Sequence, residues 1–269
     1  MNAIAMKYLY LLILLILVVV AGFFIFKLFF VQKVFRQESG KLPNTAFKPE
    51  VLINPQKPDQ PPALVFETTP QEITHGNQKQ KQVIFTFDAG SGVQSAQAIL
   101  DTLKKHNQKA TFFITGAFAE KNRNLVKAIA AAGHEIGNHT FSHPHLTQVS
   151  NEQISQELGK TENLIKEITG QTTRPYFRPP YGDRDQRVLN TAARAGYQSV
   201  YWTVDALDWK EDQGETAAQV KTKILSNLKP GTIFLMHLGD NITGQILDEI
   251  FNEVEKQGYG IKSLSEGLK

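Results

Sequence analysis

The sequence predicts an α/β fold, a distorted (β/α) barrel of about seven strands, for residues 82–269. Short β-branched and aromatic runs alternate there with amphipathic stretches, and this alternation is typical of a parallel sheet with helical crossovers. Seven strands in about 188 residues fall short of the roughly 250 residues of an eight-unit barrel. A seven-unit or distorted barrel therefore fits better than a complete one, and an open doubly wound sheet is the alternative.

The elements follow from composition and period. The predicted strands are QVIFTFD (82–88), KATFFITG (109–116), HEIGNHT (134–140), PYFRPP (175–180), YQSVYWTVD (197–205), GTIFLMHLG (231–239) and YGIKSL (259–264). Helices are predicted over residues 94–105, 121–132, 151–169, 184–195, 216–227 and 243–257. The third helix has the clearest ends, because Ser150 and Gln153 form a capping-box pattern and Gly170 is a natural stop.

Residues 1–36 are predicted to form a membrane anchor. The stretch Tyr8 to Phe26 has 19 residues without a charge, about 28 Å as a helix, close to the ~30 Å hydrocarbon core of a bilayer. A cleaved signal peptide is the alternative, but no small-x-small cleavage site follows the run. Basic residues after the span (Lys27, Lys33, Arg36, Lys41) outnumber Lys7 before it. By charge alone, this favours a cytoplasmic C-terminal side.

Residues 37–81 are predicted to be a tether. Seven of the 12 prolines of the chain lie in this stretch, and proline both fixes φ and removes a backbone donor. In an extended conformation it could reach on the order of 100 Å from the membrane. The alternative is a loop that packs along the folded domain.

Composition excludes several classes of function. The chain has no cysteine, so disulfide scaffolds, thiolate metal sites and cysteine nucleophiles are excluded. The formal charge of +3 is too small to indicate a nucleic-acid partner.

Polar residues gather where the predicted strands end. In parallel architectures the carboxyl ends of strands carry the ligand site. Five strand ends or the loops after them supply polar side chains here: Asp88, Asn138 with His139 and His143, Arg178, Asp205 with Asp208, and His237. Such a set is hard to explain as a solvated surface.

Each of these residues also has a simpler interpretation. His139 and His143, at spacing i, i+4, would share one face of a helical turn and could bind a metal, but a solvent-facing pair is as common. Asp88 could cap the next helix. Arg178 could hold a carboxylate with two bonds or form a surface ion pair. His237 could be a core histidine, although Asp208 could fix its tautomer and favour its protonated form.

Five segments in order resemble the NodB-homology polysaccharide deacetylases, carbohydrate esterase family 4. They are TFDAG (86–90), HTFSH (139–143), RPPYG (178–182), DALDW (205–209) and LMH (235–237). The resemblance covers residues 82–265. It implies a distorted barrel and metal-dependent hydrolysis of N-acetyl groups on sugars, with O-acetyl esters as substrates of some members.

The resemblance also implies residue roles. Asp88 would be the general base and Arg178 would orient it. His139 and His143 would hold one divalent metal ion, with zinc first and cobalt or nickel as alternatives. The Tyr181 N–H would stabilise the oxyanion, and Trp209 and Leu235 would wall the acetyl pocket. His237 would be the general acid, tuned by Asp208.

One position departs from the family pattern. The first motif usually carries a second aspartate as a metal ligand, and this chain has Ala89 there. Two protein ligands remain, below the three typical of catalytic zinc. The metal could bind more weakly, Asp88 could become a ligand, or the domain could only bind glycan.

The sequence therefore predicts a metal-dependent deacetylase of an extracytoplasmic polysaccharide, with peptidoglycan amino sugars as the default substrate. The alternatives are a catalytically weakened, wall-tethered glycan-binding module and a small-molecule amidase. Because the polymers lie outside the cytoplasm, the predicted topology is a single-pass cell-membrane protein with its catalytic domain outside, against the charge count.

Overall fold

The computed structural model describes residues 70–269. Within that part of the chain no helix is both long and apolar enough to cross a bilayer. The predicted membrane anchor (1–36) and most of the predicted tether (37–81) lie outside the described residues. Residues 70–81 are described, and they lie against the barrel.

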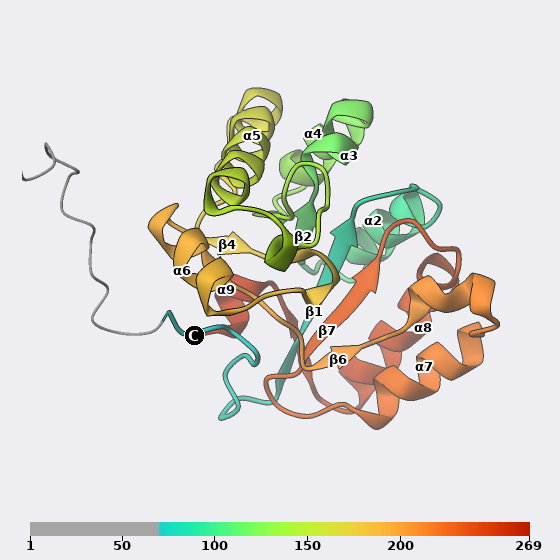
Figure 1. Ribbon diagram of the computed structural model, residues 1–269. Coiled ribbons are helices and arrows are strands. Elements are labelled where there is room, and N and C mark those ends of the chain that lie inside the picture. Colours follow the sequence, from blue (N-terminus) through green and yellow to red (C-terminus); the bar gives the residue numbers. More distant parts are fainter. Residues whose placement is uncertain (1–69) are drawn as a thin grey trace, which may run out of the picture. The chain divides into compact units, whose positions relative to one another are not determined.

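All the described strands that pair do so in parallel, in the order β5-β4-β3-β2-β1-β7-β6, with β8 pairing to β1 (Figure 1). The strands are β1 (Gln82–Ala89), β2 (Thr111–Ile114), β3 (Glu135–Asn138), β4 (Tyr176–Phe177), β5 (Gln198–Ser199), β6 (Val204–Asp205), β7 (Ile233–His237) and β8 (Gly260–Lys262). The helices are α2 (Ala96–Lys105), α3 (Gly116–Lys121), α4 (Arg123–Ala131), α5 (Asn151–Thr169), α6 (Gln186–Arg194), α7 (Ala217–Ser226), α8 (Ile242–Lys256) and α9 (Leu264–Gly267).

The predicted parallel α/β architecture is confirmed, with one more strand than expected. The run 197–205 was predicted as one strand, but it forms β5 and β6, which lie at opposite ends of the sheet order. Only residues 200–203 connect these two strands, so the sheet must curl until its two outer strands come close. The result is a curled, incompletely closed half-barrel, consistent with the predicted distorted barrel.

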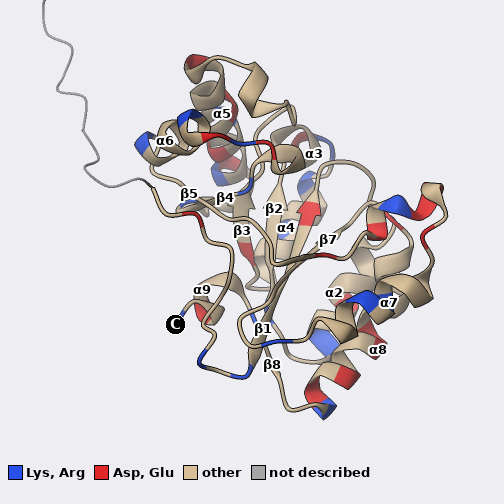
Figure 2. Ribbon diagram, turned by 60° about the horizontal axis from the view of Figure 1, so that its bottom comes forward, with Lys and Arg blue, Asp and Glu red and all other residues tan. Residues whose placement is uncertain are grey.

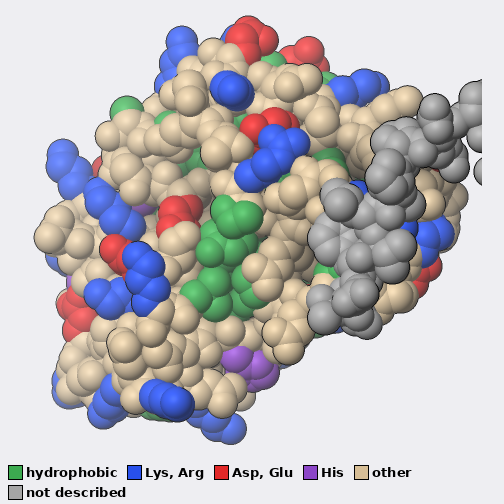
Figure 3. All heavy atoms as spheres, turned by 90° about the vertical axis from the view of Figure 1, so that its left-hand side faces the viewer, with side chains coloured by type: hydrophobic (Ala, Val, Ile, Leu, Met, Phe, Trp, Pro, Cys, Tyr) green, Lys and Arg blue, Asp and Glu red, His purple; other side chains and the backbone are tan. Residues whose placement is uncertain are grey.

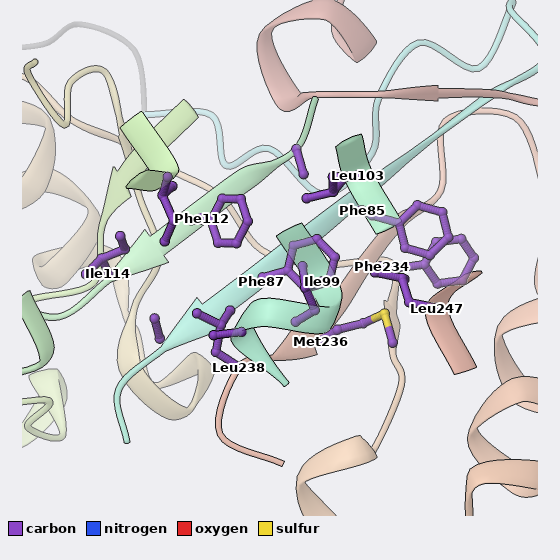
Figure 4. Packing of buried hydrophobic residues seen from close by; sticks show 14 of the residues in the cluster. Phe85, Phe87, Ile99, Leu103, Phe112, Ile114, Phe234, Met236, Leu238 and Leu247 are labelled. Atoms are coloured by element: carbon purple, nitrogen blue, oxygen red, sulfur yellow. The ribbon is translucent and has the colours of Figure 1, made fainter. Parts of the chain in front are cut away.

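Side-chain alternation along β1 separates the core from the site. Val83, Phe85 and Phe87 enter the apolar layer between the sheet and its helices. Figure 4 shows this layer, where Phe85 and Phe234 stack with centroids 5.0 Å apart beside Leu247 of α8. Because successive side chains point to opposite faces of a strand, Ile84, Thr86 and Asp88 face the barrel interior. Asp88 is thereby aimed inward at the carboxyl end of β1.

Most of the helices begin and end within two residues of their predicted ranges. Ser150 and Gln153 form the predicted capping box of α5, and Gly170 ends that helix at φ 75°. The helix predicted over 121–132 is instead divided at Asn122, whose ψ of 38° is not helical. The first part begins earlier because the Thr115 side chain accepts a hydrogen bond from Phe118 N.

Charged residues of both signs are spread over the described helices, strands and loops (Figure 2). On the face that lies to the left in Figure 1, a small group of hydrophobic side chains lies among charged ones (Figure 3).

Candidate active site

Asp88 and Arg178 form a buried ion pair at the mouth of the barrel. Arg178 Nη1 donates to Asp88 Oδ1 at 2.7 Å, and the Arg178 side chain is 0% exposed. The two-bond pairing considered from sequence is absent. Nη1 also donates to Thr86 Oγ1, while Nε and Nη2 donate to the Val200 and Tyr201 carbonyls. Arg178 therefore orients Asp88 through one bond and is itself held by the barrel backbone.

His139 and His143 meet in a loop and not on a helical turn. Residues 139–145 are irregular, and Thr140 and His143 have positive φ angles of 65° and 61°. Asn138 Oδ1 accepts from Thr140 N at 2.9 Å and holds the first of these turns. The two rings nevertheless pack edge to face, with centroids 4.8 Å apart. The two imidazoles are therefore adjacent, as the i, i+4 spacing predicts, but through the turns of a loop and not through a helix.

Charge and burial set the protonation of these three groups. Burial opposes ionisation of Asp88, but Arg178, His139 and His237 outweigh it and lower the Asp88 pKa. Burial lowers the pKa of His139, and burial with the nearby His139 lowers that of His143 to about 4. Near neutral pH the site therefore presents a carboxylate and two uncharged imidazoles.

The two imidazoles suit a divalent cation. His139 Nδ1 lies 2.8 Å from the Arg178 carbonyl oxygen, which can only accept, so Nδ1 carries the hydrogen. The Nε2 lone pair is then free and lies 3.4 Å from Asp88 Oδ2. A backbone partner on the other ring nitrogen is the usual support for a metal-binding histidine. In residues 70–269, no cluster of three or more His, Asp, Glu or Cys side chains has metal-site geometry.

Ala89 stands where a third ligand would be expected. Its side chain is fully buried and belongs to the apolar layer between the sheet and the helices. Its carbonyl accepts from Thr115 N at 3.0 Å. The methyl group supplies no donor atom, and any charge placed here would enter an apolar environment.

His237 and Asp208 form the second pair of the site. His237 Nδ1 lies 2.9 Å from Asp208 Oδ1, and Asp208 is fully buried. The other carboxylate oxygen accepts from His237 N at 2.7 Å and from Thr243 Oγ1 at 2.6 Å. Burial alone would lower the His237 pKa, but the charge and hydrogen bond of Asp208 raise it to about 9. The His237 side chain is 27% exposed, so a proton on Nε2 can reach a bound molecule.

The three predicted substrate-contacting residues occupy different environments. Tyr181 has a left-handed backbone (φ 58°), and its ring is 61% exposed and stacks on His145 at 4.2 Å. Trp209 is 46% exposed and donates from Nε1 to Asp205 Oδ2 at 3.3 Å. Leu235 is buried on β7, two residues before His237.

Sequence reasoning missed residues that support these groups from a distance. Thr243 on α8 holds Asp208. Asn138, which the sequence placed at a strand end without assigning it a role, fixes the turn after His139. Glu72 pairs with Arg184, beside the Tyr181 loop. Thr243 and Glu72 have no local signal, because their partners Asp208 and Arg184 lie far from them in sequence.

Comparisons with known proteins found one family model and several similar sequences and structures. The family model described as polysaccharide deacetylase matches residues 75–200. The peptidoglycan-N-acetylmuramic acid deacetylase PdaA of Bacillus subtilis is 37% identical over 191 residues, 71% of this chain and 73% of PdaA. The peptidoglycan-N-acetylglucosamine deacetylase of Bacillus cereus is 38% identical over 187 residues, 68% of this chain and 66% of its own length.

A solved structure adds a contrast. A carbohydrate esterase family 4 pseudoenzyme from Bacillus anthracis is similar with a TM-score of 0.71 at 32% identity, covering 76% of this chain and 70% of that one. A mutant of the same protein has restored enzymatic activity. Similarity in this family thus extends to both active and inactive members.

Proposed function

This chain belongs to the polysaccharide deacetylase family, carbohydrate esterase family 4, and on that premise we propose that it removes N-acetyl groups from peptidoglycan amino sugars. The observation that carries the proposal is the pairing of an ionised, Arg178-held Asp88 with a protonated, Asp208-held His237 at one end of the barrel. Asp88 and His237 are register partners on β1 and β7. An amide needs both a base for the attacking water and an acid for its leaving nitrogen.

Each residue of the site has a separate role in the proposed reaction. Asp88 takes a proton from the attacking water, and His237 donates one to the departing amine. The Tyr181 N–H donates to the acetamide oxygen as it gains charge, while Trp209 and Leu235 enclose the methyl group. His139 and His143 would hold a divalent cation, with zinc as the first candidate, which when bound polarises the carbonyl and favours deprotonation of water.

Acetate release tests the proposal. The full chain should release acetate from purified peptidoglycan and from N-acetylglucosamine oligomers, and a chelator should abolish the release. Comparing muramic acid and glucosamine products would identify the sugar. Glycan binding without any acetate release, at any divalent metal concentration, would instead favour the glycan-binding module, which Ala89 makes the second candidate.

Replacing Ala89 by aspartate should raise the metal affinity of the proposed site at His139 and His143. Without metal, Ala89→Asp buries an unpaired charge in an apolar layer, so its melting temperature should fall. Added Zn²⁺ should restore much of that loss if the introduced carboxylate turns out of this layer toward His139 and His143, and half-maximal activity should then need roughly tenfold less metal than in the wild type. Calorimetric Zn²⁺ titration and thermal unfolding measure both effects.

Ala89→Asn is the matched control, because it adds the same volume without the charge. Equal zinc affinity for Ala89→Asp, Ala89→Asn and wild type would contradict the proposed metal position.

We propose in addition that the domain is extracytoplasmic, because its proposed polymer substrate lies there. The predicted anchor and tether would carry the domain outside the membrane. Protease added to intact cells should digest the C-terminal domain, and complete protection of that domain would overturn this topology.

A further inference from the structure

Residues 71–74, which we call the strap, cross the gap between the two outer strands of the barrel. Ile73 N donates to Ser199 O on β5, and Tyr201 N donates to Ile73 O, both at 2.8 Å. Thr203 Oγ1 donates to Thr74 O at 2.8 Å, close to the start of β6. The strap therefore helps to order the 200–203 segment, at whose ends Val200 N and Thr203 N also donate to the Phe177 and Ile233 carbonyls.

Glu72 in the strap makes a two-bond ion pair with Arg184. Arg184 Nε and Nη2 donate to the two Glu72 oxygens at 2.9 and 2.7 Å. Ser199 Oγ also donates to Glu72 Oε1 at 2.9 Å. Both side chains are largely buried, at 15% and 26% exposed, so this pair is less screened than a surface one.

Arg184 transmits this contact to the loop that carries Tyr181. Its guanidinium lies 3.6 Å from the Tyr201 ring centroid, and Nη1 donates to the Gly182 carbonyl at 3.1 Å. Gly182 has a positive φ of 66°, and a Cβ atom there would meet Tyr201 at 2.8 Å. The loop thus rests directly on the segment that the strap orders.

The same segment also holds the residue that orients Asp88. Arg178 donates to the carbonyls of Val200 and Tyr201. Two of the contacts proposed for catalysis, the Arg178–Asp88 pair and the Tyr181 N–H, therefore rest on one backbone segment. Glu72 is the charged side chain that ties the strap to the Tyr181 loop, 112 residues away from Arg184 in sequence.

We propose that Glu72 is a positioning residue, which through Arg184 holds the Tyr181–Gly182 turn in the conformation that presents the Tyr181 N–H to the acetamide oxygen. The inference rests on the proposed function for its catalytic consequence. The geometric part, that Glu72 fixes the Tyr181 turn, can be measured without any turnover.

Glu72→Gln keeps the shape of the side chain and removes the charge that the Arg184 fork requires. The full chain labelled with ¹⁵N-tyrosine has seven tyrosines, and Tyr181→Phe identifies the Tyr181 amide signal. We expect this signal to shift in Glu72→Gln and in Arg184→Lys. It should stay in place in Glu249→Gln, which makes the same change of residue in a more exposed ion pair between α7 and α8.

Acetate-release kinetics provide the second measurement. Glu72→Gln should lower kcat about tenfold and leave KM within about twofold, because the loop geometry matters most for the developing oxyanion. An unmoved Tyr181 signal, or an unchanged kcat in an active wild-type enzyme, overturns the inference. A shifted signal with no acetate release from the wild type would instead overturn the proposed function and leave the link between Glu72 and the turn intact.

Discussion

Asp88→Asn is expected to reduce acetate release by about 10²- to 10⁴-fold, the usual contribution of a general base. Asp88 faces the barrel interior, and its pKa is lowered by Arg178 and the nearby histidines despite burial. It is therefore ionised and able to accept a proton near neutral pH. An amide of the same shape can accept a hydrogen bond from Arg178 but cannot take a proton from water.

The measurement must separate chemistry from folding, because Arg178 would lose its counter-charge. Breaking a buried ion pair by removing one partner costs several kcal/mol, about 3–5. Rates should therefore be taken well below the melting temperature of the variant. Asp101→Asn, on the exposed face of α2, is the matched control. An Asp88→Asn enzyme within threefold of wild type would refute the role of Asp88 as base.

Asp208→Asn should move the alkaline limb of the kcat–pH profile to lower pH by about two to three units, and the lost protonation should cost about 10- to 10²-fold in activity near pH 8. As general acid, His237 must carry a proton, so activity falls as pH rises through its pKa. That pKa is about 9 because the Asp208 charge and hydrogen bond outweigh burial, with help from Asp88 and Asp205. Without the Asp208 charge, the His237 proton is lost at lower pH.

A further acid faces the same pair. Asp240 is buried, and burial together with Asp208 raises its pKa to about 7. Its ionisation in alkaline solution would add negative charge near His237 and so sustain protonation of the imidazole.

The control for Asp208→Asn is Asp212→Asn, in the same 3₁₀ segment, which should leave the kcat–pH profile unchanged. An unshifted alkaline limb in Asp208→Asn would show that another group sets it.

The sequence indicated the residues of the candidate site better than the residues that hold them in place. Asp88, His139, Arg178, Asp208 and His237 could be singled out because strand period and strand ends are local properties. The division of residues 197–205 into β5 and β6 could not be predicted, because that run has the composition of one continuous strand. It breaks because its two halves pair with different neighbours, β4 and β7.

The contacts of Glu72 and Thr243 could not be predicted from the sequence for a related reason. Glu72 lies in a proline-rich stretch that predicts a tether, and Thr243 begins an ordinary amphipathic helix. Their importance depends on Arg184 and Asp208, which only the folded chain brings to them. The loop geometry of His139 and His143 was also missed, although the hydrogen bond from Thr140 N to Asn138 Oδ1 that turns the chain there is local.

The absence of ladder pairing between β5 and β6 bears on how the chain can be shortened. A version that begins at residue 75 would uncover the Ser199 C=O and the Tyr201 N–H that Ile73 now pairs. Unpaired groups along an outer strand invite association between molecules. Soluble versions should therefore start before Glu72, and those that start later are expected to aggregate at concentrations where the longer ones remain monodisperse.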